Sequence, residues 1–217
     1  MTAVQQVPCT VLFLGEFLGT AILMYIGCMG CVVEFQGGPI LPAFAFGFAI
    51  LAAVQIVGHI TGCHMNPAIS LGILILGKIN WKDCIIYFLG QYLGALAGYA
   101  ALKVMMSSEY NTICVLKLDN GVNFIQGLFI EIVVTGILMF VVAGSMDEKN
   151  KNKSDSASLR IGLTVAGFIF AAVTSLRARI LQAAQEIPLA EVVQPRNQSF
   201  ADVNFALKMT VDISSSF

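Results

Sequence analysis

The residues best suited to chemistry lie in one polar stretch of an apolar neighbourhood, the segment GHITGCHMNPAISLGILILG from Gly58 to Gly77. Pro67 suits the first position of a helix, because its φ is preset and it has no N–H to leave unpaired. Asn66 can then cap that helix while its side-chain NH₂ stays available as a neutral hydrogen-bond donor. The helix N-terminus adds about half a unit of positive charge, which repels cations. This is the chemistry of weak, neutral hydrogen bonding, although an Asn-Pro pair alone fits a helix cap in a cytoplasmic loop equally well.

The helix that would begin at Asn66 is too short to cross a bilayer. It ends near Leu76, so it holds about 11 residues and is roughly 16 Å long, about half of the hydrocarbon core. The segment His59–Met65 before it is irregular, and irregular backbone at membrane depth is tolerated only where it lines protein or water. We therefore predict a re-entrant half-helix at residues 66–76.

The composition of the chain indicates a membrane protein with several spans. Of its 217 residues, 57% are hydrophobic and only 12% are charged, and the mean hydropathy is +0.82. A soluble globular domain is nearer one quarter charged. The net charge of −1 gives no indication of a nucleic-acid partner. The first eight residues lack the basic region of a cleaved signal peptide, so the first apolar stretch is predicted to be retained.

Five segments are apolar and long enough, or nearly so, to span a membrane, which takes about 20 residues. Together with the half-helix at 66–76 they make up a predicted transmembrane domain of residues 1–176, and residues 177–217 form a predicted non-membrane tail. The predicted spans are Val11–Val33, Pro39–Gly58, Cys84–Met106, Val122–Gly144 and Leu159–Leu176.

Basic residues between these spans orient the chain. Lysines concentrate in Lys78–Asp83 and Asp147–Arg160, whereas Glu34–Gly38 and Ser107–Gly121 hold one lysine between them. Lysine-rich loops belong in the cytoplasm. Because the half-helix does not cross, both rich loops fall on the side of the N-terminus, which is therefore predicted to be cytoplasmic.

The chain contains an internal repeat with an offset of 115 residues. The segment EFLGTAILM at Glu16–Met24 matches EIVVTGILM at Glu131–Met139, and Phe46-Gly47-Phe48 falls onto Ile161-Gly162-Leu163. An odd number of spans separates the matching helices, so the two halves must be inverted relative to each other. Inverted repeats place a transport site near the membrane midplane between the halves.

The repeat is incomplete. Its offset requires a second Asn-Pro-Ala at 181–183, where the sequence reads Leu181-Gln182-Ala183, and no partner of Cys84–Met106 follows. The predicted fold class is an all-α membrane protein, an inverted-repeat helix bundle with one re-entrant half-helix that is C-terminally truncated or altered. We expect the tail from Arg177 to be a variant C-terminus that arises from altered splicing, a frameshift or a gene-model error. The alternative is a native tail that folds back onto the protein.

Ionisable and cysteine residues inside the apolar segments have mostly structural interpretations. Glu16 and Glu131 must face protein, because an acidic residue near the bilayer centre costs about 2.5–3.5 kcal/mol. His64 and His59 are interpreted as buried residues that hold the loop, with direct contact of His64 to water as the alternative.

Six cysteines would suit a disulfide set by count, but several lie in apolar stretches, where cysteine acts as a small hydrophobe. No disulfide framework, metal site or cofactor is therefore expected.

The segment GHITGCHMNPAISLG resembles the first signature of the aquaporins, or major intrinsic proteins, a Ser/Thr-Gly-x-His-x-Asn-Pro-Ala core between a second span and a half-helix. The Glu-x-x-x-Thr starts of the first and fourth spans also look like the two buried glutamates of that family. The resemblance covers Val11–Val173. The second Asn-Pro-Ala, the selectivity arginine and the sixth span of the family have no counterpart, and the repeat register puts Ala184 where the arginine would be.

The resemblance implies roles for particular residues. Phe46 matches the aromatic residue of the family's outer constriction. Ile169 takes the fifth-span constriction position, where water-selective relatives tend to have His, so an apolar residue there suits a wider filter. The implied pore and selectivity residues are His64, Asn66, Pro67, Ala68, Phe46 and Ile169, and the implied structural supports are Glu16, Glu131 and His59.

The function implied is a passive transmembrane channel, not an enzyme, for water and for small neutral solutes such as glycerol or urea. Because the second half-helix is missing, we predict that this chain is an impaired conductor. One alternative is a non-conducting scaffold or regulatory subunit that associates with full-length channel subunits, and another is half of a secondary transporter. Expected partners are membrane lipids and either identical subunits in a tetramer or full-length relatives, and the expected location is the plasma membrane or retention inside the cell.

Overall fold

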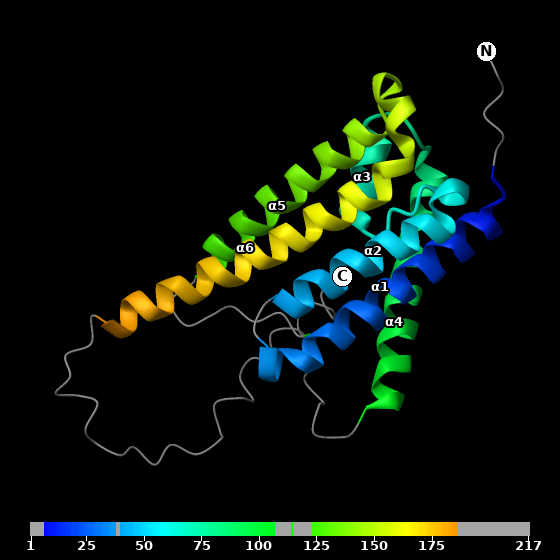
Figure 1. Ribbon diagram of the computed structural model, residues 1–217. Helices are drawn as coiled ribbons and strands as arrows, with labels where there is room; N and C mark the ends of the chain where they lie inside the picture. The colour runs from blue at the N-terminus through cyan, green and yellow to red at the C-terminus, as the bar shows by residue number, and fades with distance from the viewer. Residues whose placement is uncertain (1–6, 38–39, 107–113, 115–122, 186–217) are drawn as a thin grey trace.

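The computed structural model describes residues 7–37, 40–106, 114 and 123–185, with side chains described as far as residues 31 and 171 in the first and last helices. Every regular element in this part of the chain is helical, as expected (Figure 1). The elements are α1 (Cys9–Gly37), α2 (Ile40–Thr61), α3 (Pro67–Ile75), α4 (Trp81–Met105), α5 (Phe124–Ser145), the 3₁₀ segment η2 (Glu148–Ser156) and α6 (Ala157–Gln185).

Short polar residues begin the helices, as local chemistry requires. Asn80 caps α4 by accepting a hydrogen bond from the backbone N–H of Asp83 at 2.9 Å. Asn123 and Gln126 form a reciprocal capping box at the start of α5, with each side chain accepting from the other residue's backbone N–H. These caps satisfy donors that the first turn of a helix leaves unpaired.

Within the described residues, four helices are long and apolar enough to cross a membrane: Cys9–Cys31, Ile40–Thr61, Trp81–Met105 and Phe124–Ser145. They coincide closely with the first four predicted spans. The fifth predicted span lies in α6, which does not end at Leu176 but continues as one helix to Gln185. The rest of the predicted tail, residues 186–217, lies outside the described residues.

Glycines bring α4 directly against α1. A Cβ built on Gly90 would lie 2.7 Å from the carbonyl oxygen of Phe13, and those built on Gly94 and Gly98 would collide with the backbone of Phe17 and Ala21. The GxxxG spacing of these glycines therefore marks a close helix–helix contact, as its small residues predict.

The two repeats meet at equivalent glycines. Gly47 on α2 and Gly162 on α6, which the offset of 115 aligns, face each other so closely that a Cβ on either would lie 2.5–2.7 Å from the other's carbonyl oxygen. The two helices are in contact and run in opposite directions (Figure 1). This antiparallel pairing of equivalent helices is the arrangement that an inverted repeat requires.

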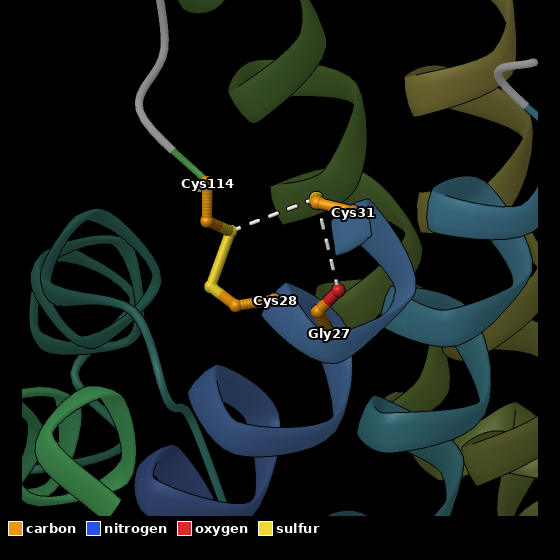
Figure 2. The surroundings of a disulfide bond; sticks show 4 residues. All are labelled: Gly27, Cys28, Cys31 and Cys114. Atoms are coloured by element: carbon orange, nitrogen blue, oxygen red, sulfur yellow. Dashed lines mark hydrogen bonds between the residues drawn. A yellow bond between two sulfur atoms is a disulfide. The ribbon is translucent and has the colours of Figure 1, made fainter. Parts of the chain in front are cut away.

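One disulfide bond corrects the prediction about cysteines. Cys28 on α1 is bonded to Cys114, with the two Cα atoms 5.3 Å apart (Figure 2). Cys28 lies in the second half of α1, nine residues before the last residue of that helix. The prediction failed because it judged Cys28 by its apolar neighbours in the sequence, whereas pairing depends on a residue 86 positions further along the chain.

Candidate functional site

The segment between α2 and α3 enters the centre of the bundle in an irregular conformation. Gly62, Cys63 and Met65 have positive φ angles of 85°, 49° and 53°. Such angles are unusual for residues with a side chain, so the surroundings must hold Cys63 and Met65 in place. Both side chains belong to the hydrophobic core, where they pack with Ile50, Ala53 and Val57 of α2.

The Glu16 carboxylate fixes this segment from α1. It is fully buried and accepts hydrogen bonds from the backbone N–H groups of His64 and Met65, each at 2.9 Å. It also accepts from the Thr61 hydroxyl at 3.2 Å and from Gln91 Nε2 at 2.8 Å. A buried carboxylate with four donors is well satisfied, which explains how an acidic residue is accommodated inside an apolar span.

His64 is held from two sides. Its Nδ1 lies 3.1 Å from the Ser70 hydroxyl oxygen on α3, and its ring stacks on that of Tyr87 on α4 with the centroids 4.2 Å apart. The Tyr87 hydroxyl donates to the carbonyl oxygen of Thr61, and Gln91 Nε2 lies 2.9 Å from the Ser70 hydroxyl. One network therefore joins α1, the irregular segment, α3 and α4.

The half-helix begins as its residues predict. Asn66 is the N-cap of α3, its Oδ1 accepts from the backbone N–H of Ala68 at 2.8 Å, and Pro67 occupies the first turn. Ser70 closes the first turn by donating its backbone N–H to the carbonyl of Asn66 at 3.0 Å. At nine residues, α3 spans about 13–14 Å, less than half of a hydrocarbon core.

A cavity of about 180 Å³ lies beside the N-terminus of this half-helix. The polar side chains at its wall are His64 and Asn66, and the remaining wall is mostly apolar. The wall comes from both repeats. Its residues are Leu23, Phe46, Ile50, Val54, Gly62–Asn66, Ile69, Leu138, Val142, Ile161 and Val165.

The structure brings together some of the predicted site residues and separates others. Phe46, His64 and Asn66 share the cavity wall. Pro67 and Ala68 are exposed at the start of α3, and Ile169 is half-buried on α6 but does not line this cavity.

Two of the predicted supporting residues differ from expectation. His59 is exposed on the last turn of α2, so the prediction that it is buried like His64 is wrong. Glu131 is exposed on α5, and among the described residues no loop packs against its carboxylate in the way that the irregular segment packs on Glu16. In the part of the chain that the structure describes, α5 has no buried residues and no irregular segment covers it.

Four contributors to the network were not predicted: Thr61, Ser70, Tyr87 and Gln91. All four are buried, and Gln91 and Tyr87 are polar residues one turn apart on a helix that is otherwise largely apolar. A buried polar pair at that spacing needs partners, which is the signal that could have identified them.

The comparisons with known proteins agree with this geometry. The profile of a family described as major intrinsic protein matches residues 3–182, so the chain belongs to the major intrinsic protein family. The chain is 35% identical over 162 residues to Aquaporin-1 from Homo sapiens, with 70% of this chain and 60% of that protein covered. It is 33% identical to the lens fiber major intrinsic protein from Gallus gallus, with 72% and 62% covered.

The fold also has a counterpart among solved structures. An aquaglyceroporin from Plasmodium falciparum superposes with a TM-score of 0.61 at 24% identity, covering 76% of this chain and 71% of that one. The chain spans about six tenths of the length of the two relatives described above.

Proposed function

We propose that this chain is a membrane channel subunit of the aquaporin type, and not an enzyme, whose solute site is the cavity beside Asn66. The observation that carries this proposal is that the half-helix begins, at its cap Asn66, beside a cavity whose wall comes from both inverted repeats. A helix N-terminus disfavours cations, and a neutral amide can hold water or a small neutral solute weakly. The names of the relatives support a channel for water or small solutes.

The same geometry supports a low conductance for this chain alone. Only one half-helix N-terminus borders the cavity in the described residues, and the repeat position of the second Asn-Pro-Ala reads Leu181-Gln182-Ala183. The cavity then has one of the two half-helix N-termini that would repel cations, and one of the two half-helices that would complete the pore wall. Association with full-length relatives, as a scaffold or regulatory subunit, is the second candidate function, and the absence of buried residues along the described α5 favours it.

Osmotic shrinkage of proteoliposomes tests the proposal. Vesicles that contain this chain alone should show water permeability close to that of empty vesicles, while vesicles with a full-length family member should shrink much faster. Robust permeability from this chain alone, reduced by Asn66→Asp, would support the channel and contradict the low conductance. Robust permeability that Asn66→Asp leaves unchanged would contradict the proposed site.

We propose that the protein lies in the plasma membrane with its N-terminus in the cytoplasm. The start of α1 and η2, which carries Lys149, Lys151 and Lys153, lie toward the same end of the bundle (Figure 1). The Cys28–Cys114 bond is attached to the second half of α1, away from the start of that helix. Because disulfides persist in oxidising compartments and lysines favour the cytoplasmic side, both features support this orientation.

A further inference from the structure

Three cysteine sulfurs gather beside the second half of α1. Cys28 is bonded to Cys114, and Cys31 Sγ lies 3.7 Å from Cys114 Sγ (Figure 2). The Cys31 thiol also donates to the carbonyl oxygen of Gly27 at 3.9 Å. In this view Cys114 Sγ lies between the sulfurs of Cys28 and Cys31 (Figure 2).

We propose that Cys28, Cys31 and Cys114 form a thiol–disulfide exchange site with two alternative bonds. Disulfides exchange when a thiolate attacks one sulfur of the bond and displaces the other. Here Cys31 gives up its proton and its sulfur attacks Cys114 Sγ, so that a Cys31–Cys114 bond forms. The Cys28–Cys114 bond breaks, and Cys28 leaves as a thiolate and takes up a proton. One bond replaces another, so the step needs no oxidant or reductant.

The exchange would move the attachment point of Cys114 along α1. Cys28 and Cys31 are three residues apart on one helix, which is about 4.5 Å along its axis. The two positions also differ in burial, since Cys28 is fully buried and Cys31 is half-buried. The alternative bond therefore ties residue 114 to a more accessible turn.

This part of α1 supports the wall of the cavity. Gly27, next to Cys28, packs on the ring of Phe46, and a Cβ there would collide with that ring. Phe46 in turn lines the cavity. The exchange site therefore acts on the turn of α1 that contacts Phe46, so replacing one bond by the other could alter one wall of the cavity.

Thiol counting after denaturation tests whether the second bond can form. The wild-type chain has six cysteines and one disulfide, which leaves four thiols to react with a mass-tagged maleimide. In Cys28→Ser, a Cys31–Cys114 bond leaves three thiols among five cysteines, and the tag count rises to five only after reduction. Cys31→Ser should also show three thiols. The double variant Cys28→Ser/Cys31→Ser should show four thiols. Cys9→Ser, at the far end of α1, should keep the native bond and serves as the control.

Tandem mass spectrometry of the unaltered full chain tests the exchange itself. The protein is held at pH 8.5 in detergent, quenched in acid, alkylated and digested, and fragment ions between Cys28 and Cys31 show which of them carries the alkyl group. We expect both linkages to Cys114, with the Cys31 linkage lost when the sample is alkylated before it is raised to pH 8.5. Detection of the Cys28–Cys114 linkage alone, or five free thiols in Cys28→Ser, would overturn the proposal. If Cys28→Ser does not fold, the measurement on the unaltered chain decides.

Discussion

At the scale of single residues, Glu16 organises the candidate site. Its carboxylate accepts from two backbone N–H groups, one hydroxyl and one amide, and these four donors come from two separate parts of the chain, Thr61–Met65 and Gln91. The positive φ angles of Cys63 and Met65 depend on such support, because each is costly for a residue with a side chain. Glu16 therefore holds the segment whose end is Asn66.

Glu16→Gln should lower the free energy of unfolding by about 1–3 kcal/mol, because an amide leaves one of the buried backbone donors without an acceptor. Glu131→Gln is the matched control, since Glu131 occupies the equivalent position of the repeat but is exposed on α5. That variant should leave the free energy unchanged or raise it. The measurement is equilibrium unfolding in mixed detergent, followed by fluorescence of Trp81. Equal losses in the two variants would contradict the supporting role of Glu16.

At the scale of helices, small residues decide which elements touch. Gly90, Gly94 and Gly98 of α4 let its backbone approach α1, and Gly47 and Gly162 do the same where α2 meets α6. The first contact presses α4, with Tyr87 and Gln91, against the helix that carries Glu16. The second contact joins the two repeats and closes one side of the cavity.

Gly94→Ala should destabilise the bundle by about 1–3 kcal/mol, because the added methyl group meets backbone of Phe17 that cannot rotate away. This cost exceeds the gain of about 1 kcal/mol that alanine brings over glycine in a helix. Gly136→Ala on α5 is the control, since a Cβ there meets nothing within 4 Å. Thermal unfolding in detergent compares the two variants. A transition temperature raised by both substitutions would show that α4 and α1 are packed less closely than described.

At the scale of the whole molecule, the two repeats are unequal. The first repeat holds α1, α2, α3 and α4 around the Glu16 network, whereas α5 contributes no buried residue in the described chain and α6 contacts the first repeat mainly through α2. A complete inverted repeat would cover α5 with a second half-helix. In the described chain α5 lines the cavity through Leu138 and Val142.

The number of spans determines on which side of the membrane the C-terminal part lies. With five spans and a cytoplasmic N-terminus, the acceptor sequence Asn197-Gln198-Ser199 is outside the cell and should be glycosylated in cells. Asn152-Lys153-Ser154 in η2 has the same pattern but should remain unmodified. Glycosidase-sensitive gel mobility, with Asn197→Gln and Asn152→Gln as controls, reports the result. Modification of Asn152 would reverse the proposed orientation.

Much of this protein follows from its sequence because the relevant physics is local. Apolar runs long enough to cross a bilayer predicted the helices that the structure describes, and Asn66-Pro67 predicted a capped half-helix, since capping depends on adjacent residues. The repeat predicted that the two halves are inverted, and the antiparallel contact of α2 with α6 at Gly47 and Gly162 agrees with that prediction. The family also follows from one short motif and its context.

Only the tertiary structure decided which polar groups meet. Glu16 and Glu131 start similar segments, yet one is buried among four donors and the other is exposed, because within the described residues a covering segment packs on only one of them. Likewise, the Cys28–Cys114 bond joins residues that are 86 positions apart, and no local pattern contains that distance. Hydrogen bonds and disulfides depend on positions in space, whereas helix formation and membrane insertion depend on neighbours in the chain.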